Sequence, residues 1–306
     1  MRILYLDLDA LNPSHLSCYG YARPTSPTID SIASQGVRFT NCYAADAPCL
    51  PSRTGLYSGR FGIQTGVVGH GGLGAQPKPE TTREFRDSFG KFGLAAQLRN
   101  AGMHTAMISP FGERHSAHWF YAGFKEIHNT GKSGQERVDD VQPVVEKWLG
   151  EHASDDNWFL HVNYWDIHTP YRTPMEYGHP FQNTPLSDDY TADMLKRHQT
   201  RGGPHSPLDV GMYTDAGIGY QASNPRVPDR LDSMDKLKQW IDGYDTAIRY
   251  VDDAIAKIVA MLKEAGVYDE TTIVISADHG ENQGHLGIYG EHATADHATC
   301  NIPLIV

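Results

Sequence analysis

The chain has 306 residues, and its 37 acidic and 26 basic side chains give it a formal net charge of -11 at pH 7. This length is enough for one large α/β domain, or for one domain with a small appendage. Phosphate backbones are bound by basic surfaces, so an acidic protein is a poor partner for nucleic acid. No apolar run approaches the roughly 20 residues that span a bilayer. We therefore expect neither a nucleic-acid nor a membrane partner.

Cysteine usage and the amino terminus indicate the cellular compartment. The four cysteines, Cys18, Cys42, Cys49 and Cys300, show no metal-site spacing. The chain opens directly with a strand-like segment at residues 2–6, without a basic segment and an apolar leader before it. These features predict a soluble protein in the reducing cytoplasm.

Predicted strands and helices alternate along the chain. Ser26 is expected to cap a helix over residues 27–35, and Gly36 is expected to end it. Strands interleaved with helices predict an α/β fold, in which a mainly parallel sheet is flanked by helices on both faces. The predicted strands cover residues 3–8, 104–109, 158–164, 271–277 and 302–306, and the further predicted helices cover 92–100, 138–149 and 234–264.

Two long segments differ sharply in pattern. Residues 234–264 carry apolar side chains at steps of three and four, which predicts a long amphipathic helix. Residues 173–232 are rich in Pro, Gly, Asp and Ser and show little periodicity, so we interpret them as a loop-rich insertion that faces the substrate. We treat residues 1–306 as one catalytic domain. The chain ends inside the apolar segment 302–306, which is typical of a core strand.

The most informative motif is the run from Cys49 to Arg53, CLPSR, which is followed by a Gly-Arg pair at residues 59–60. This Cys-x-Pro-Ser-Arg pattern resembles that of the type I sulfatases of the alkaline phosphatase superfamily. In that family a maturation enzyme oxidises the cysteine to formylglycine. The resemblance extends over nearly the whole chain and is also carried by residues 7–20, 165–171 and 277–306. It implies a sulfatase-like fold whose smaller C-terminal subdomain is missing from this sequence.

The resemblance implies hydrolysis of a sulfate ester, carried by a sulfated small molecule or glycan. The breadth of the family favours a carbohydrate. A hydrated formylglycine at residue 49 carries two hydroxyls on one carbon. One hydroxyl attacks sulfur, and deprotonation of the other then expels sulfate and restores the aldehyde. An unmodified, buried cysteine is the structural alternative for Cys49.

Two acidic motifs are the expected metal ligands. Asp9 follows the first strand, and Asp278 with His279 follows the apolar residues 273–275, at the strand ends where α/β proteins bind ligands. By resemblance these three residues, with residue 49, hold Ca²⁺, and Mg²⁺ or Mn²⁺ is the alternative. Many sulfatases carry a second aspartate where this chain has Ala10. Asp7 points to the same side of the strand as Asp9 and is expected either to replace that ligand or to be hydrogen-bonded near the strand end.

Four further residues are expected to contact the substrate, and a fifth, His115, is not. His168, in the family's His-x-Pro-Tyr element, is expected to touch the sulfate and protonate the leaving alcohol. Arg53 is expected to orient the formylglycine hydroxyl. His70 falls where related enzymes place a polar active-site residue, and His292 falls where many hold a sulfate-binding lysine. His115 lies near the family's Lys-x-His region, but the lysine is absent, and we interpret it as a loop histidine.

Two other functions remain open at this point. Relatives with the same nucleophile and metal site act as phosphonate monoester hydrolases or phosphodiesterases, and the missing lysine at His292 favours this alternative. A non-catalytic binding fragment is the second alternative. It predicts an unmodified Cys49, no metal uptake and no turnover.

Overall fold

The computed structural model describes residues 1–78, 88–132, 136–210 and 225–306. Within these residues, seven strands form one sheet in the order β2-β7-β6-β1-β5-β3-β4. The five strands from β6 to β4 run parallel, whereas β7 pairs antiparallel with β6 and β2 antiparallel with β7. The mainly parallel sheet is thereby confirmed. The strands are β1 (Arg2–Leu8), β2 (Arg38–Phe39), β3 (His104–Ile108), β4 (Glu126–His128), β5 (Trp158–Tyr164), β6 (Thr271–Ser276) and β7 (Leu304–Ile305).

The edge of the sheet is where the sequence was least informative. The predicted strand over 302–306 is reduced to two residues, and β2 and β4 were not predicted at all. Strands of two or three residues are too short to show the alternation by which a strand is recognised. The four predicted inner strands are found, each with bounds within one residue of those expected.

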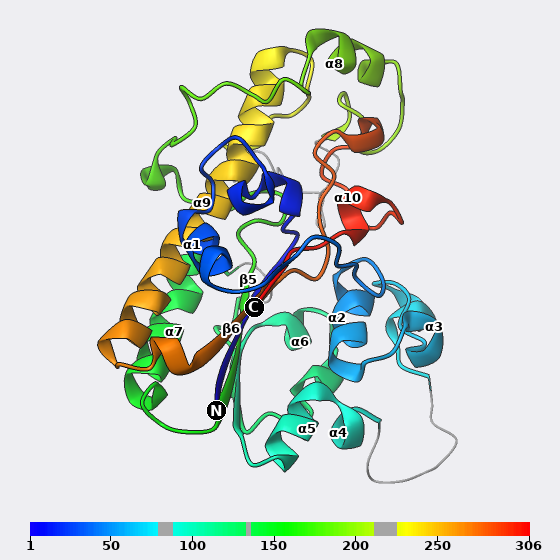
Figure 1. Ribbon diagram of the computed structural model, residues 1–306. Coiled ribbons are helices and arrows are strands. Elements are labelled where there is room, and N and C mark those ends of the chain that lie inside the picture. The colour runs from blue at the N-terminus through cyan, green and yellow to red at the C-terminus, as the bar shows by residue number, and fades with distance from the viewer. Residues whose placement is uncertain (79–87, 133–135, 211–224) are drawn as a thin grey trace.

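Helices cover both faces of the sheet, as predicted (Figure 1). Side chains alternate along β1, so that Leu4, Leu6 and Leu8 pack in one core, while Ile3 and Tyr5 face the other. The first face is covered by α1 (Pro27–Gln35), α7 (Val138–His152) and α9 (Met234–Glu264), and the second by α2 (Cys49–Ser58), α4 (Ser88–Phe92) and α5 (Leu94–Asn100). The remaining helices are α3 (Gly62–Thr65), α6 (Phe111–Arg114), α8 (Ala192–Gln199) and α10 (His297–Cys300).

The bounds of α1 and α9 match the prediction, but the cap of α1 does not. Ser26 makes no side-chain hydrogen bond to the free backbone amides of α1. The Asp252 carboxylate of α9 accepts from the Thr28 and Ile29 N–H groups instead, at 2.9 and 2.8 Å. A residue more than 200 positions away thus caps the helix, which the local sequence did not indicate.

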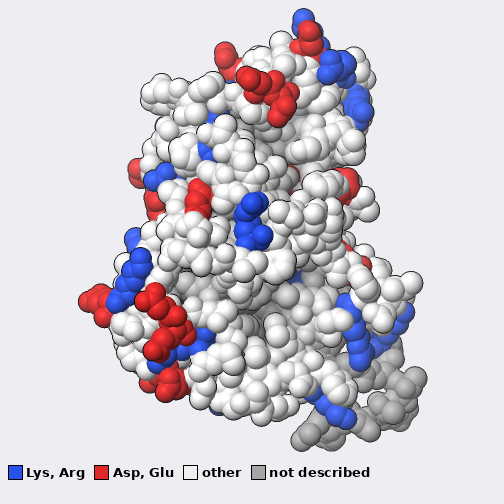
Figure 2. Space-filling view, viewed as in Figure 1, with Lys and Arg blue, Asp and Glu red and all other residues white. Residues whose placement is uncertain are grey.

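Charged side chains are spread unevenly over the face of the molecule drawn in Figure 2. Figure 2 shows acidic side chains mainly near α8 and around the α7–α9 layer, with fewer over the middle of this face. None of the helices in the described ranges combines the length and the apolar character that a membrane crossing requires.

Candidate active site

The predicted site residues meet at the carboxyl edge of the sheet. β1 and β6 pair in parallel, with Asp7 opposite Ser276, so Asp9 and Asp278 leave adjacent strands at the same edge. The motif residues from Cys49 to Arg53 form the first turns of α2, which stands over this edge. That helix was not predicted, and it buries both Cys49 and Arg53.

Arg53 lies among three buried carboxylates. Its Nε and Nη2 donate to the two oxygens of Asp7 at 2.7 and 3.0 Å. Its Nη1 donates to Asp9 at 2.9 Å and to Asp278 at 2.6 Å. One positive charge therefore faces three negative charges. Asp9 Oδ1 is buried and has no hydrogen-bond partner among the described residues. The cluster therefore has a surplus of negative charge and an oxygen that could bind a further cation.

The pKa values of Asp278 and Asp7 in this cluster are shifted in opposite directions. Burial raises the pKa of Asp278 to about 6, and Asp9 adds to this against the opposing charge of Arg53. Burial also acts on Asp7, but there the charge of Arg53 and the hydrogen bond from His161 outweigh it and lower the pKa well below the usual range. The negative charge of Asp7 is thus neutralised by Arg53, whereas the negative charge of Asp278 is only partly neutralised.

Cys49 contacts a histidine whose orientation is set by the backbone. The Nδ1–H of His279 donates to the Gly280 carbonyl at 2.9 Å, so Nε2 faces Cys49 Sγ at 3.3 Å. The φ angle of Gly280 is not in the left-handed region. A Cβ there would lie 2.1 Å from the Ala298 carbonyl oxygen, so glycine is required for the close approach of these two backbone segments.

Four of the five predicted metal ligands form one group. Asp9, Cys49, Asp278 and His279 each offer one ligand atom, and all four atoms lie within 4.8 Å of one another. Excess negative charge, an unpartnered carboxylate oxygen and a single imidazole suit a divalent cation. Asp7 lies outside the group, and both of its oxygens accept from Arg53. Its contacts agree with the second expectation, a hydrogen-bonded carboxylate, and do not support its role as a ligand.

The backbone after Asp9 is unusual at the place of the missing family aspartate. Ala10 is in the left-handed region, with φ of 61°, which is rare for a residue with a Cβ. This conformation directs its N–H to Asp278 Oδ1 at 3.1 Å, and Tyr244 Oη donates to its carbonyl at 2.7 Å. Ala10 therefore supports the site through its backbone.

Imidazoles surround Cys49. His292 stacks on His279, with ring centres 4.7 Å apart, and His168 lies edge-on to His292 at 4.5 Å. His70 Nε2 accepts from the Leu50 N–H at 3.2 Å. Burial lowers the pKa of His168 and His292 well below the usual range. The three histidines predicted from the family pattern are therefore brought together, and burial favours the neutral form of His168 and His292.

The structure places two further residues beside the site. His115, interpreted from the sequence as a loop histidine, has its ring centre 4.8 Å from that of His70, with the two rings tilted, and shares a potential ligand group with Cys49. Arg114 lies over the Trp165 ring at 4.4 Å, and Trp165 donates to Asp9 at 3.3 Å. Only their position in the sequence could have indicated this, because Arg114 and His115 follow β3 at the edge of the sheet where the other site residues lie.

The segment 173–232 borders the loop that leads to His292. His205 pairs with Glu291 at 3.0 Å, and Tyr190 Oη donates to the Gln283 carbonyl at 3.0 Å. Within its described residues the segment contains α8, and residues 211–224, which the predicted insertion includes, lie outside the described part.

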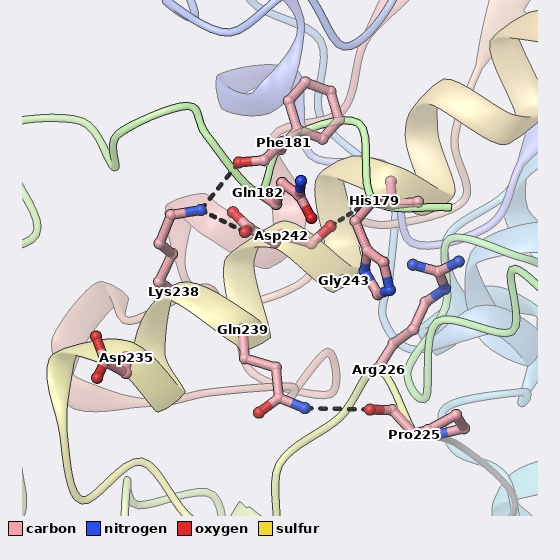
Figure 3. Close-up of a pocket in the computed structure, with 11 residues that line it drawn as sticks. His179, Phe181, Gln182, Pro225, Arg226, Asp235, Lys238, Gln239, Asp242 and Gly243 are labelled. Atoms are coloured by element: carbon pink, nitrogen blue, oxygen red, sulfur yellow. Dashed lines mark hydrogen bonds and ion pairs between the residues drawn. The ribbon is translucent and has the colours of Figure 1, made fainter. Parts of the chain in front are cut away.

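A separate cavity of about 270 Å³ lies between this segment and α9 (Figure 3). Lys238 Nζ lines it and donates to the Phe181 carbonyl at 2.9 Å and to Asp242. Gln239 donates to the Pro225 carbonyl at 3.1 Å. None of the predicted site residues is among its described lining residues, so it is distinct from the cluster around Cys49.

Comparison with known proteins decides the family. The family model described as Sulfatase matches residues 2–306. The chain belongs to the sulfatase family. This sulfatase-family chain is 25% identical to iduronate 2-sulfatase of Mus musculus over 352 residues, which covers 100% of the chain and 59% of that protein. It thus spans less than two thirds of the length of this curated relative.

Solved structures share the fold of this sulfatase-family chain. A protein in complex with its substrate D-glucosamine-2-N,6-O-disulfate matches with a TM-score of 0.74 and 20% identity, over 99% of this chain and 70% of that one. The phosphonate monoester hydrolase of Agrobacterium radiobacter matches with a TM-score of 0.70 and 20% identity, over 99% of this chain and 67% of that one. These likenesses confirm the sulfatase-like architecture.

Proposed function

We propose that the chain is the catalytic part of a sulfatase that hydrolyses a sulfate ester of a carbohydrate, with formylglycine at residue 49 as nucleophile. One observation carries this proposal: Cys49 Sγ shares a buried group with Asp9, Asp278 and His279, beside the Arg53 guanidinium. A structural cysteine has no need of two buried carboxylates and an imidazole at its side chain.

The two hydroxyls of the hydrated aldehyde divide the reaction into a displacement at sulfur and an elimination at carbon. One hydroxyl gives its proton to a neighbouring carboxylate, and its oxygen forms a bond to sulfur while the bond from sulfur to the alcohol oxygen breaks and that oxygen takes a proton from His168. The second hydroxyl then loses its proton to a neighbouring imidazole, the carbonyl re-forms, and sulfate leaves. Water adds to the aldehyde to restore the hydrate. Arg53, held by Asp7 on one edge, keeps a fixed positive charge beside residue 49.

His168 is the proposed acid for the leaving alcohol. Its Nδ1–H donates to the Thr169 carbonyl at 2.6 Å, so Nε2 is the atom that exchanges a proton. Burial lowers its pKa. The protonated form is therefore a strong acid, and the charge of a bound sulfate ester favours that form.

A divalent cation completes the proposed site. Asp9, Asp278 and His279, with the oxygen of residue 49, would hold it. When bound, the cation supplies positive charge that activates a hydroxyl and neutralises the sulfate oxygens. Calcium is the proposed ion, because the protein ligands are mostly carboxylate oxygens.

The carbohydrate part of the proposal has support from relatives. Iduronate 2-sulfatase matches the whole chain, and one structural neighbour was solved with a disulfated glucosamine. The segment 173–232 reaches the loop that carries His292 and is the proposed wall for the sugar.

The direct test is mass spectrometry of the peptide containing residue 49, after expression with and without a formylglycine-generating enzyme. We expect replacement of the thiol by an aldehyde only with that enzyme, together with aryl sulfate turnover. The matched control is Cys49→Ala, which keeps the fold and abolishes turnover. Protein that keeps an unmodified Cys49 in the presence of that enzyme, takes up no metal and shows no turnover would support a non-catalytic fragment instead.

A phosphonate monoester hydrolase is the second candidate. The observation that favours it is His292, a neutral imidazole at the place of a sulfate-binding lysine. Kinetics of the modified protein on matched aryl sulfate and aryl phosphonate esters separate the two. A higher kcat/KM for the phosphonate would replace our first choice.

A further inference from the structure

The unmodified cysteine form presents a different set of metal ligands from the mature form. Cys49, His279 and His292 each offer one ligand atom, and these three atoms lie within 4.8 Å of one another. All three side chains are buried, with exposed fractions of 2%, 0% and 3%. One sulfur and two imidazole nitrogens are ligands that zinc prefers, whereas calcium prefers oxygen.

We propose that the unmodified chain binds Zn²⁺ through Cys49 Sγ, His279 and His292, so that the chemical state of residue 49 selects the metal. With a thiol, the cluster takes a soft ion. With formylglycine no sulfur is present, and the oxygens of Asp9, Asp278 and residue 49 dominate. The zinc-bound form lacks the formylglycine nucleophile and is therefore catalytically inert. Zinc binding needs no oxidant, because the thiol proton passes to solvent as the sulfur–zinc bond forms.

The distances suit this ion. Zinc–sulfur and zinc–nitrogen bonds of about 2.3 and 2.0–2.1 Å place the ligand atoms of a tetrahedral site roughly 3.4–3.6 Å apart. Cys49 Sγ and His279 Nε2 are 3.3 Å apart, so this pair needs almost no movement. His279 is already oriented, since its other nitrogen donates to the Gly280 carbonyl. The His292 ring lies nearly parallel to that of His279, so it must rotate toward the ion as well as move its nitrogen by up to roughly 1.4 Å, given the 4.8 Å limit.

A fourth ligand and an access route are also in place. Asp9 Oδ1 is buried, has no hydrogen-bond partner in the described part of the chain, and belongs to a ligand group with Cys49 and His279. On another side, Cys49 shares a group with His70 and His115, and His70 is exposed. We infer that the ion enters the cluster beside this exposed side chain.

The test uses full-length chain from a host that lacks the maturation enzyme, with an intact Cys49 verified by mass. Calorimetric titration with Zn²⁺ should give one ion per chain. Titration with Co²⁺ should give a thiolate-to-cobalt charge-transfer band. Cys49→Ser should weaken zinc binding at least about 100-fold, about 2.7 kcal/mol, and remove the band. His292→Gln should weaken it about 10- to 100-fold.

Cys42→Ser is the matched control, because Cys42 is a half-buried thiol outside these ligand groups. It should leave both titrations unchanged. A cobalt band that persists in Cys49→Ser, or zinc affinities equal in that variant and the parent, would overturn the proposal. Calcium binding by Cys49→Ser shows that this variant is folded.

This inference stands apart from the proposed sulfatase activity. If modified protein turns over sulfate esters and the thiol form fails to bind zinc, only the zinc inference falls. If the thiol form binds zinc and no modification or turnover is found in any host, only the proposed function falls.

Discussion

Two buried ion clusters in this molecule differ in one respect. The first surrounds Arg53, with three carboxylates and a partnerless oxygen on Asp9. The second surrounds Arg23, whose Nη1 donates to Asp242 and Asp245 at 2.8 Å each. Lys238 also pairs with Asp242, so two positive charges meet two negative charges. The second cluster is balanced, and the first has a surplus of negative charge.

Hydrogen bonding shows the same contrast. Arg23 uses its other nitrogens on the Pro185 and Thr184 carbonyls, at 3.0 and 3.1 Å. Both oxygens of Asp245 are occupied, one by His15 at 2.7 Å and the other by Tyr21 and Arg23. A cluster that only holds the fold satisfies its own groups. A cluster with surplus negative charge and an unpartnered acceptor oxygen is suited to binding a cation.

The largest expected effect comes from removing the two arginines in turn. Arg53→Met leaves the carboxylates of the first cluster without their arginine, and Arg23→Met leaves Asp245 without its arginine, so each should lower the free energy of unfolding by about 3–5 kcal/mol. Calcium should restore part of the loss in Arg53→Met and none in Arg23→Met. Urea unfolding with and without Ca²⁺ measures both. If Arg53→Met is unfolded without calcium, refolding on calcium addition is followed by circular dichroism. Equal responses of the two variants would remove the distinction between the clusters.

A buried carboxylate outside both clusters gives the next effect. Burial raises the pKa of Asp166 to about 7, from 3.8 in the ordinary state. The native state therefore holds this proton to higher pH than the unfolded chain, and stability is lost as pH rises from about 4 to about 7. Asp166→Asn should be more stable than the parent at pH 8 by about 4 kcal/mol. The two should agree near pH 4. Chemical denaturation across this range measures it, and a constant difference would contradict the assignment.

Asp9 tests the metal side of the comparison. Calcium at 100 times its Kd should stabilise the mature protein by about 2.7 kcal/mol through binding to the folded state. Asp9→Asn should remove this increment, because it neutralises the ligand with the partnerless oxygen. Asp242→Asn, in the balanced cluster, should keep it. Thermal unfolding with calcium or a chelator compares the three proteins. Retention of the full increment by Asp9→Asn would exclude Asp9 as a ligand.

The smallest effect is expected at the edge of the balanced cluster. Tyr21→Phe removes one hydrogen bond to Asp245 Oδ2, which still accepts from Arg23. The loss should be about 1 kcal/mol at all calcium concentrations. Urea unfolding measures this loss, and a calcium-dependent loss would show that the two clusters are coupled.

Much of the fold could be predicted from periodicity. The 31 residues of α9 carry enough turns for the apolar spacing to be unmistakable, and the inner strands are long apolar runs. The helix α2 was missed because its sequence, CLPSRTGLYS, holds Pro and Gly and is buried nearly all round, which leaves no amphipathic stripe. The site residues Cys49, Asp278 and His279 were found because the family pattern carries them in short contiguous motifs.

By itself, the sequence determined the family, the mainly parallel α/β sheet and the residues of the motifs, since these depend on local spacing along the chain. Only the tertiary structure decided that Asp7 supports Arg53, that His115 belongs beside Cys49, and that Asp252 caps α1. These contacts join strand ends and helices far apart in sequence. Which charges share one buried volume is settled by the packing of those elements, and a linear pattern does not record it.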